Sequence, residues 1–230
     1  MAELRSNIPT KQELIDLIIA DIALSIAFSI VFGTGNFLLF FPIALFAVSI
    51  SFILHEYMHK IVAQRFGAIA AFKRSDFGII IALVTSFLGF LLAMPGATMI
   101  YTNNFTKKEN GLTSLVGPLT NLIIFLIVIS IALTVRFSSY IETALVFAAF
   151  INLWLAFFNM LPIYPLDGSK VLAWSKPLYI VVLLVAMIFL VLIGPLIGLT
   201  ILGMIFDIGF LLVIAFIMSY LYRGILFRTF

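Results

Sequence analysis

The sequence contains the stretch Leu54-His55-Glu56-Tyr57-Met58-His59-Lys60, which holds both histidines of the 230-residue chain. Residues four apart on a helix lie on one face, so His55 and His59 can direct ring nitrogens toward one small ion. The glutamate after the first histidine completes the His-Glu-x-x-His pattern of zinc peptidases, in which it is the general base. The stretch therefore predicts a metal site at His55 and His59, with Glu56 as the catalytic base.

A pattern with two free positions also arises by chance, so its setting decides its weight. Both histidines of a histidine-poor chain fall within the motif, and the motif lies inside a long apolar run. Ionisable side chains are costly at membrane depth, and a cluster of them there indicates a functional site. The setting favours a metal site over a coincidence.

The composition is that of an integral membrane protein. Hydrophobic residues make up 64% of the chain and charged residues 10%, against about one half and one quarter in soluble domains. The chain has no cysteine, which excludes disulfides, thiolate metal sites and a cysteine nucleophile. Its 13 basic residues are scattered and form no patch for nucleic acid. We expect the lipid bilayer as a partner, no nucleic acid, and no cleavable signal peptide in the polar first residues.

Apolar runs bounded by glycine, proline and polar turns predict an all-α polytopic membrane protein with six transmembrane helices. A capping box formed by Thr10 and Glu13 should begin the first span. Polar residues 103–110 are expected to form a loop, residues 117–121 should interrupt the third span, and the fourth should break at 162–168. The predicted spans cover about residues 11–32, 37–66, 112–135, 141–161, 177–193 and 199–222.

The distribution of basic residues predicts the orientation. With six crossings, twelve of the 13 lysines and arginines fall on one side, and only Arg136 falls on the other. The positive-inside rule places that side, with both termini and the active-site end of the second span, in the cytoplasm of a multi-pass cell-membrane protein. The number of crossings between the second and third spans must then be even. Because residues 77–101 are too few for two spans, we expect a small membrane-dipping strand or re-entrant unit there.

Two histidines rarely hold zinc alone, and a catalytic site usually has three protein ligands. Without further histidine or cysteine, the third must be a carboxylate, or else an amide or backbone oxygen. Asp167 follows the break in the fourth span, near the predicted depth of the histidines. Asp207 should lie about 12 Å from the outer end of the sixth span, and Asp76 should face water. We therefore expect Asp167 as the third ligand, although an Asp-Gly pair is also common in plain turns.

Two asparagines fall near the same depth, Asn121 in the third span and Asn159 in the fourth. A buried amide needs hydrogen-bond partners, and in membranes it often joins neighbouring helices. It can also donate to a scissile carbonyl and stabilise the oxyanion. The residues alone leave both interpretations open.

The chain resembles the site-2 protease family of intramembrane zinc metalloproteases. The resemblance covers about residues 37–170 and is carried by three motifs, at 55–59, 117–121 and 159–168. It implies one zinc ion bound by His55, His59 and Asp167, with Glu56 activating water. It also implies that Asn159, and as a second candidate Asn121, binds the substrate carbonyl, and that strands lie between the core helices. The chain departs from the family at Gly168-Ser169-Lys170, where members often have two glycines and an arginine.

These observations predict an intramembrane zinc metalloprotease that hydrolyses peptide bonds of transmembrane protein substrates. We expect residues 1–230 to form a single transmembrane metalloprotease domain without a PDZ or CBS domain. An edge strand near 95–101 or 68–76 is a hypothetical site for binding an unwound substrate by strand addition. Two alternatives stay open: a proteolytically inactive zinc-binding membrane protein that binds clients, and a metal transporter. The intact Glu56 argues against the first, and the lack of an inverted repeat argues against the second.

Overall fold

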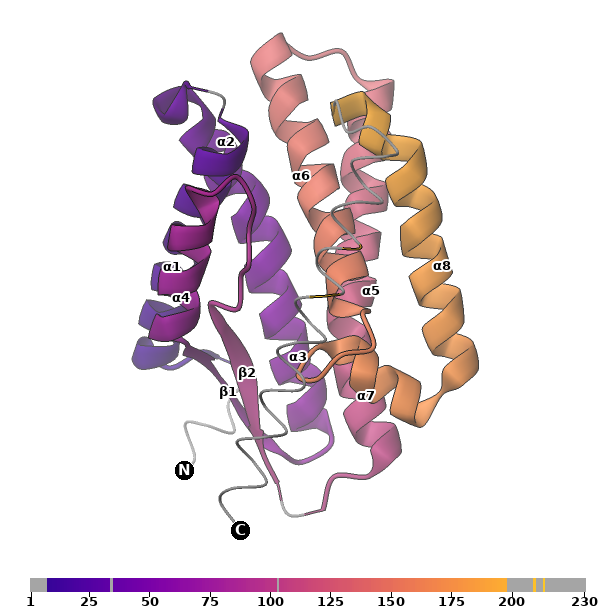
Figure 1. Ribbon diagram of the computed structural model, residues 1–230. Coiled ribbons are helices and arrows are strands. Elements are labelled where there is room, and N and C mark those ends of the chain that lie inside the picture. The colour runs from indigo at the N-terminus through magenta and orange to yellow at the C-terminus, as the bar shows by residue number, and fades with distance from the viewer. Residues whose placement is uncertain (1–7, 34, 103, 198–208, 210–212, 214–230) are drawn as a thin grey trace.

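Five long apolar helices dominate the computed structural model of the chain, which describes residues 8–33, 35–102, 104–197, 209 and 213 (Figure 1). Each is long and apolar enough to cross a membrane. The sixth predicted span, residues 199–222, lies outside the described residues except for positions 209 and 213. The five are α1 (Lys11–Phe32), the continuous helix Phe37–Arg65, α5 (Lys107–Thr134), α6 (Ser139–Asn159) and α8 (Lys176–Ile193).

Helix Phe37–Arg65 is built from three pieces. It comprises α2 (Phe37–Val48), the π-helical turn η2 (Ser49–Ile53) and α3 (Leu54–Arg65), which carries both histidines. Single π-turns inside α-helices occur frequently at functional sites. Here Ser49 Oγ donates a hydrogen bond of 2.7 Å to Asp21 Oδ2 on α1, so the turn is tied to a neighbouring helix directly before the motif.

Capping boxes set the first turns of α1 and α5. In α1 the Glu13 amide donates to Thr10 Oγ1 and the Thr10 amide to Glu13 Oε2, as the sequence predicts. Thr106 and Glu109 form the same arrangement at α5. The prediction of a loop over 103–110 is therefore wrong for residues 107–110, because this second capping box begins the helix at Lys107, while residues 104–106 do form a loop. The predicted interruption at 117–121 is also wrong, since α5 continues through Pro118.

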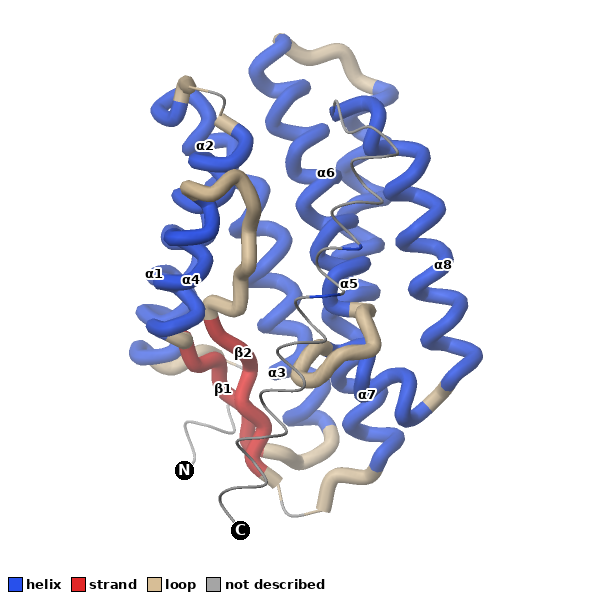
Figure 2. The backbone as a smooth tube through the Cα atoms, in the orientation of Figure 1, coloured by secondary structure: helices blue, strands red, loops and turns tan. Residues whose placement is uncertain are grey.

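A strand–helix–strand unit connects α3 to α5. It consists of β1 (Ile69–Arg74), α4 (Asp76–Ser86) and β2 (Gly96–Tyr101), and the two strands pair antiparallel with Ile69 opposite Tyr101 (Figure 2). At 1.5 Å per residue, α4 is about 16 Å long, roughly half of what a membrane crossing requires. The chain thus returns to the end of the molecule at which α3 ends. This return agrees with the expected even number of membrane crossings between the second and third spans.

Two groups of helices pack around the centre of the molecule. Helix α1 packs on α2, α4 and β1, while α5 packs on α3, α6 and α7 (Asp167–Trp174), and α8 on α6. Small residues let these backbones approach closely, as is usual between membrane helices. Fully buried alanines line the contacts of α1, α2 and α6: Ala20, Ala27, Ala44, Ala47, Ala148, Ala149 and Ala156.

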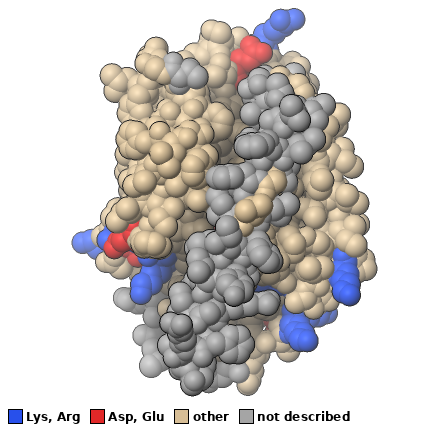
Figure 3. All heavy atoms as spheres, in the orientation of Figure 1, with Lys and Arg blue, Asp and Glu red and all other residues tan. Residues whose placement is uncertain are grey.

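Few charged side chains lie on the surface that Figure 3 presents. Most of those visible lie in the lower half, where α3 ends and α5 begins, and the upper half is almost uncharged below its rim. An apolar belt of this kind fits a protein whose sides face lipid.

Candidate metal centre

Three potential ligand atoms converge between α3 and α7. His55 Nε2 lies 3.0 Å from His59 Nε2, and Asp167 Oδ2 lies 3.3 Å from the former and 3.1 Å from the latter. All three residues are buried, with exposures between 4% and 8%. The structure therefore brings together the two histidines and the aspartate that the sequence singled out.

This arrangement suits a tetrahedral zinc ion. With ligand distances of about 2.0–2.2 Å, a tetrahedral site places its ligand atoms about 3.3–3.6 Å apart. The observed separations of 3.0 to 3.3 Å are close to that range. Two imidazole nitrogens and one carboxylate oxygen are also a donor set that catalytic zinc sites use, with a fourth position left for water. The residues present fit the metal that the motif predicts.

Local structure explains how Asp167 reaches the histidines. The chain breaks after α6, and Asp167 is the first residue of α7, where the helix dipole favours a carboxylate. A Cβ atom at Gly168 would overlap the backbone oxygens of Met160 and Leu161, so only glycine allows this close return. Lys170 Nζ lies 3.8 Å from Asp167 Oδ1, the oxygen turned away from the histidines. The unusual Gly168-Ser169-Lys170 sequence therefore still supports the turn.

The Asp167 carboxyl lies outside the spanning helices, and two opposing effects act on it. Burial raises the pKa of this group, but the charges and hydrogen bonds of His59 and His55 outweigh the effect. They hold the pKa of Asp167 below its ordinary value. Asp167 is therefore electrostatically coupled to both histidines.

The outer ring nitrogens of both histidines are also held. His55 Nδ1 lies 2.5 Å from Asn121 Oδ1, and His59 Nδ1 lies 2.6 Å from the backbone oxygen of Thr113. Such acceptors fix the tautomer that leaves Nε2 available to a metal. The Asn121 amide nitrogen in turn donates to Ser51 O at 3.1 Å and to Asn152 Oδ1 at 3.0 Å. Asn121 is completely buried; its oxygen orients His55, and its nitrogen is held by Ser51 and Asn152.

Helix α5 approaches the two imidazoles at Gly117. A Cβ atom at this position would overlap the rings of both His59 and His55. The glycine of the 117–121 motif thus provides space for the ligands, while Asn121, one helical turn later, provides an acceptor for one of them.

Glu56 faces away from α5 toward the small sheet. The Thr98 amide and the Thr98 hydroxyl both donate to Glu56 Oε2 at 2.8 Å, and the hydroxyl also lies 3.0 Å from the Glu56 backbone oxygen. Glu56 is 8% exposed. Strand β2 therefore holds the carboxylate of the motif by one of its two oxygens.

Three further residues that hold members of the site, Thr98, Thr113 and Asn152, belong to no motif in the sequence. The sequence also predicts Asn159 near the metal. In the described part of the chain, Asn159 is half-buried at the end of α6 and donates to Leu155 O of its own helix at 3.0 Å. The structure does not bring its amide into hydrogen-bond contact with His55, His59 or Asp167.

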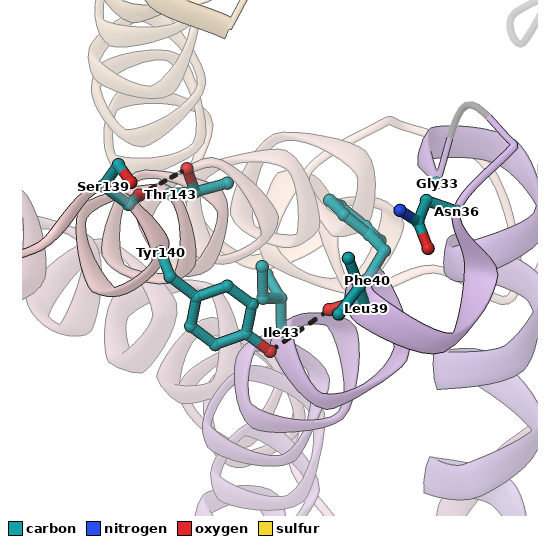
Figure 4. A pocket seen from close by; sticks show the side chains of 8 residues that line it. All are labelled: Gly33, Asn36, Leu39, Phe40, Ile43, Ser139, Tyr140 and Thr143. Carbon is teal, nitrogen blue, oxygen red and sulfur yellow. Dashed lines mark hydrogen bonds between the residues drawn. The ribbon is translucent and has the colours of Figure 1, made fainter.

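A separate hollow lies at the opposite end of the molecule, between the α1–α2 connection and the start of α6 (Figure 4). The Tyr140 hydroxyl crosses it and donates to Leu39 O at 3.1 Å. None of the metal-ligand candidates lines this hollow. Its lining consists of Gly33, Asn36, Leu39, Phe40, Ile43, Ser139, Tyr140 and Thr143.

Known proteins resemble this chain in sequence. Residues 135–175, which include α6 and Asp167, match the family model of peptidase family M50. The chain is 39% identical over 175 residues to "Putative zinc metalloprotease MJ0611" of Methanocaldococcus jannaschii, covering 75% of this chain and 90% of that protein. It is 32% identical over 154 residues to "Putative zinc metalloprotease YwhC" of Bacillus subtilis, covering 57% of this chain and 68% of that protein.

The fold and the site together define a multi-pass membrane protein of the zinc metalloprotease class. The chain belongs to peptidase family M50, the site-2 protease family of intramembrane zinc metalloproteases.

Proposed function

We propose that this chain hydrolyses peptide bonds of transmembrane protein substrates, with Glu56 as the general base. The observation that carries the proposal is that His55 Nε2, His59 Nε2 and Asp167 Oδ2 lie within 3.3 Å of one another. Glu56 lies on α3, the helix of the two histidines. These three residues would hold the zinc ion. When bound, zinc supplies a Lewis acid that polarises a carbonyl and lowers the pKa of its water to about 7.

The protein's own groups then move the proton. Both hydrogen bonds from Thr98 fall on Glu56 Oε2, so we assign the proton transfer to Oε1. At this oxygen Glu56 accepts a proton from the attacking water and later returns it to the leaving amine. Thr98 keeps the carboxylate from rotating between these two steps. Asn159, at the end of α6, remains our candidate for a donor to the substrate carbonyl, since the amide nitrogen of Asn121 already donates to Ser51 O and Asn152 Oδ1.

A helical substrate hides its carbonyls, so it must unwind before cleavage. We propose that the unwound segment pairs with the outer edge of β2. Because Thr98 directs its amide away from β1 toward Glu56, Ile100, two residues on, directs its amide the same way. Ile100→Pro should therefore reduce cleavage without breaking the pairing of β1 with β2. Unchanged cleavage by that variant would exclude strand addition at this edge.

We also propose that the active-site end faces the cytoplasm. The end of α3 and the start of α5, which carry Arg65, Lys107 and Lys108, lie at one end of the molecule, and by the positive-inside rule this favours a cytoplasmic position for that end. Membrane-impermeant labelling of single cysteines introduced at Lys108 and Arg136 tests this, since the two positions should label from opposite sides.

Cleavage of a panel of single-span membrane proteins in detergent, with and without a chelator, tests the activity. Wild type should cleave at least one panel member, and the chelator should stop it. Glu56→Gln should retain zinc and lose cleavage, while Glu142→Gln, an exposed glutamate on α6, should cleave normally. Cleavage by Glu56→Gln would contradict the assigned base. Zinc-loaded wild type that cleaves nothing would instead favour the client-binding alternative.

A further inference from the structure

A buried carboxylate near the start of α1 contacts both α3, which carries Glu56, and β1, which pairs with the strand that binds Glu56. Glu13 Oε2 lies 2.6 Å from Lys60 Nζ on α3, and Glu13 Oε1 accepts a hydrogen bond of 3.1 Å from the Phe72 amide on β1. Glu13 is 3% exposed and Lys60 is 1% exposed. The catalytic assignment above gives neither of these buried ionic groups a role.

The contact with Phe72 connects Glu13 to the general base Glu56 through the paired strands. Phe72 is the register partner of Thr98, and Thr98 binds Glu56. The Phe72 amide points out of the sheet on the β1 side and the Thr98 amide points out on the β2 side, so the pair is a non-hydrogen-bonded rung. Each amide of this residue pair is therefore bound by a different carboxylate: Glu13 binds the amide of Phe72, and Glu56 binds the amide of Thr98.

The contact with Lys60 leads to the general base through α3. Lys60 follows Glu56 by four residues, so the two side chains lie on the same face of the helix. Glu13 thus joins the helix that carries Glu56 to the strand pair that orients its carboxylate. The connected groups form a closed ring of Glu13, Lys60, Glu56, Thr98 and Phe72.

We propose that Glu13 is a positioning residue for Glu56, and that it fixes the rung of Phe72 and Thr98 at the height where Thr98 can hold the base. The inference rests on the proposed proteolytic function. Stability alone gives a poor account of the pair, because well-packed apolar residues often replace a buried ion pair without loss of stability. A carboxylate that divides its two oxygens between a helix and a strand instead fixes their separation.

Paired substitutions separate positioning from charge. Removing one ion alone would leave the other buried and unpaired, which is strongly destabilising, so both are replaced together. Glu13→Gln with Lys60→Met removes the charges but keeps an oxygen for the Phe72 amide. Glu13→Leu with Lys60→Met removes the charges, the oxygen for the Phe72 amide and the Oε2 acceptor of the Thr10 amide. We expect the first to keep kcat within about threefold of wild type and the second to lose about tenfold or more, the effect of about one hydrogen bond to a charged group.

Three further measurements show where the effect acts. In both double variants KM and the zinc content should equal those of wild type, because neither substrate binding nor the ligands are changed. Amide hydrogen exchange at Phe72 should accelerate only in the variant that carries Glu13→Leu. As a matched control, Asp16→Asn removes a pair with Arg74 on the same helix and strand, at a rung that does not lead to Glu56, and should leave kcat unchanged.

Equal kcat in the two double variants, whether normal or reduced, would overturn the proposal. Loss of zinc from the variant with Glu13→Leu would also overturn it, since Glu13 would then support the fold as a whole. The proposed function is judged by other results, namely cleavage by wild type and its loss in Glu56→Gln. Normal results there combined with full activity of both double variants would reject the inference and retain the protease.

Discussion

His55 Nδ1 lies 2.5 Å from Asn121 Oδ1, and this contact joins the metal helix α3 to α5. The amide oxygen accepts a hydrogen bond from the Nδ1–H of His55, which leaves Nε2 free to face His59 and Asp167. The third span thereby acts on the ligand set without contributing a ligand.

Asn121→Leu should therefore weaken zinc binding about 10–100-fold, the usual cost of removing such an acceptor. Competition with a calibrated zinc chelator measures this. Asn159→Leu is the matched control, because its amide bonds to its own helix, and its zinc affinity should remain normal. If that control also lost cleavage while retaining zinc, the proposed substrate contact of Asn159 would gain support.

Asp167→Asn should lower zinc affinity roughly 100-fold or more, since a neutral amide replaces the anionic ligand. Metal analysis of the purified variant after dialysis gives the result directly. Asp76→Asn changes an exposed carboxylate that pairs with Arg74 and should bind zinc as wild type does. Full zinc occupancy in the Asp167 variant would remove this residue from the ligand set.

Gly117→Ala should reduce both zinc content and cleavage, because the added methyl group occupies space filled by the His55 and His59 rings. Relief requires α5 to move away from α3, and this also stretches the contact of His59 with Thr113 O. Thr120→Ala, three residues later on the same helix, removes only a bond to Val116 O and should retain zinc. Normal zinc content in Gly117→Ala would show that the helices are looser than described here.

Thr98→Val should lower kcat about tenfold, with KM and zinc content unchanged. The substitution removes the hydroxyl bond to Glu56 but keeps the backbone bond, and one hydrogen bond to a charged group contributes about 1.5 kcal/mol. Thr102→Val, beyond the end of β2, serves as control. A lower zinc content in Thr98→Val would indicate that the strand supports the ligands rather than the base.

The sequence predicted the meeting of His55, His59 and Asp167 because depth along a membrane helix follows from residue number. A rise of 1.5 Å per residue and a span of known ends place each side chain within about one turn. The break at 162–168 was also evident from its prolines and glycine, although α7 itself was not predicted. The same argument placed Asn121 at the correct level.

Rotation about the helix axis does not follow from residue number, so the sequence could not show which side chains contact the ligands and the base. Asn121 and Asn159 fall at similar depths, yet only Asn121 faces His55, because crossing angles decide which side chains meet. Thr113 acts through a backbone oxygen, which no sequence motif reveals. Thr98 lies 42 residues from Glu56 in the sequence, and its contact with Glu56 depends on the register in which β2 pairs with β1. The capping box of Thr106 and Glu109, in contrast, is a motif that the sequence alone displays.

The π-helical turn Ser49–Ile53 has a consequence for how this chain tolerates change in length. It winds one extra residue into the helix just before the ligands, and each residue of an α-helix advances the azimuth by about 100°. Deleting a single residue there would let the turn close as an ordinary α-helical turn and leave His55, Glu56 and His59 facing α5 and β2. Deleting one residue of regular α-helix between the turn and His55 would instead rotate these side chains by about 100°. The bulge is therefore the place where this helix can change its length by one residue without turning the catalytic side chains away from α5 and β2.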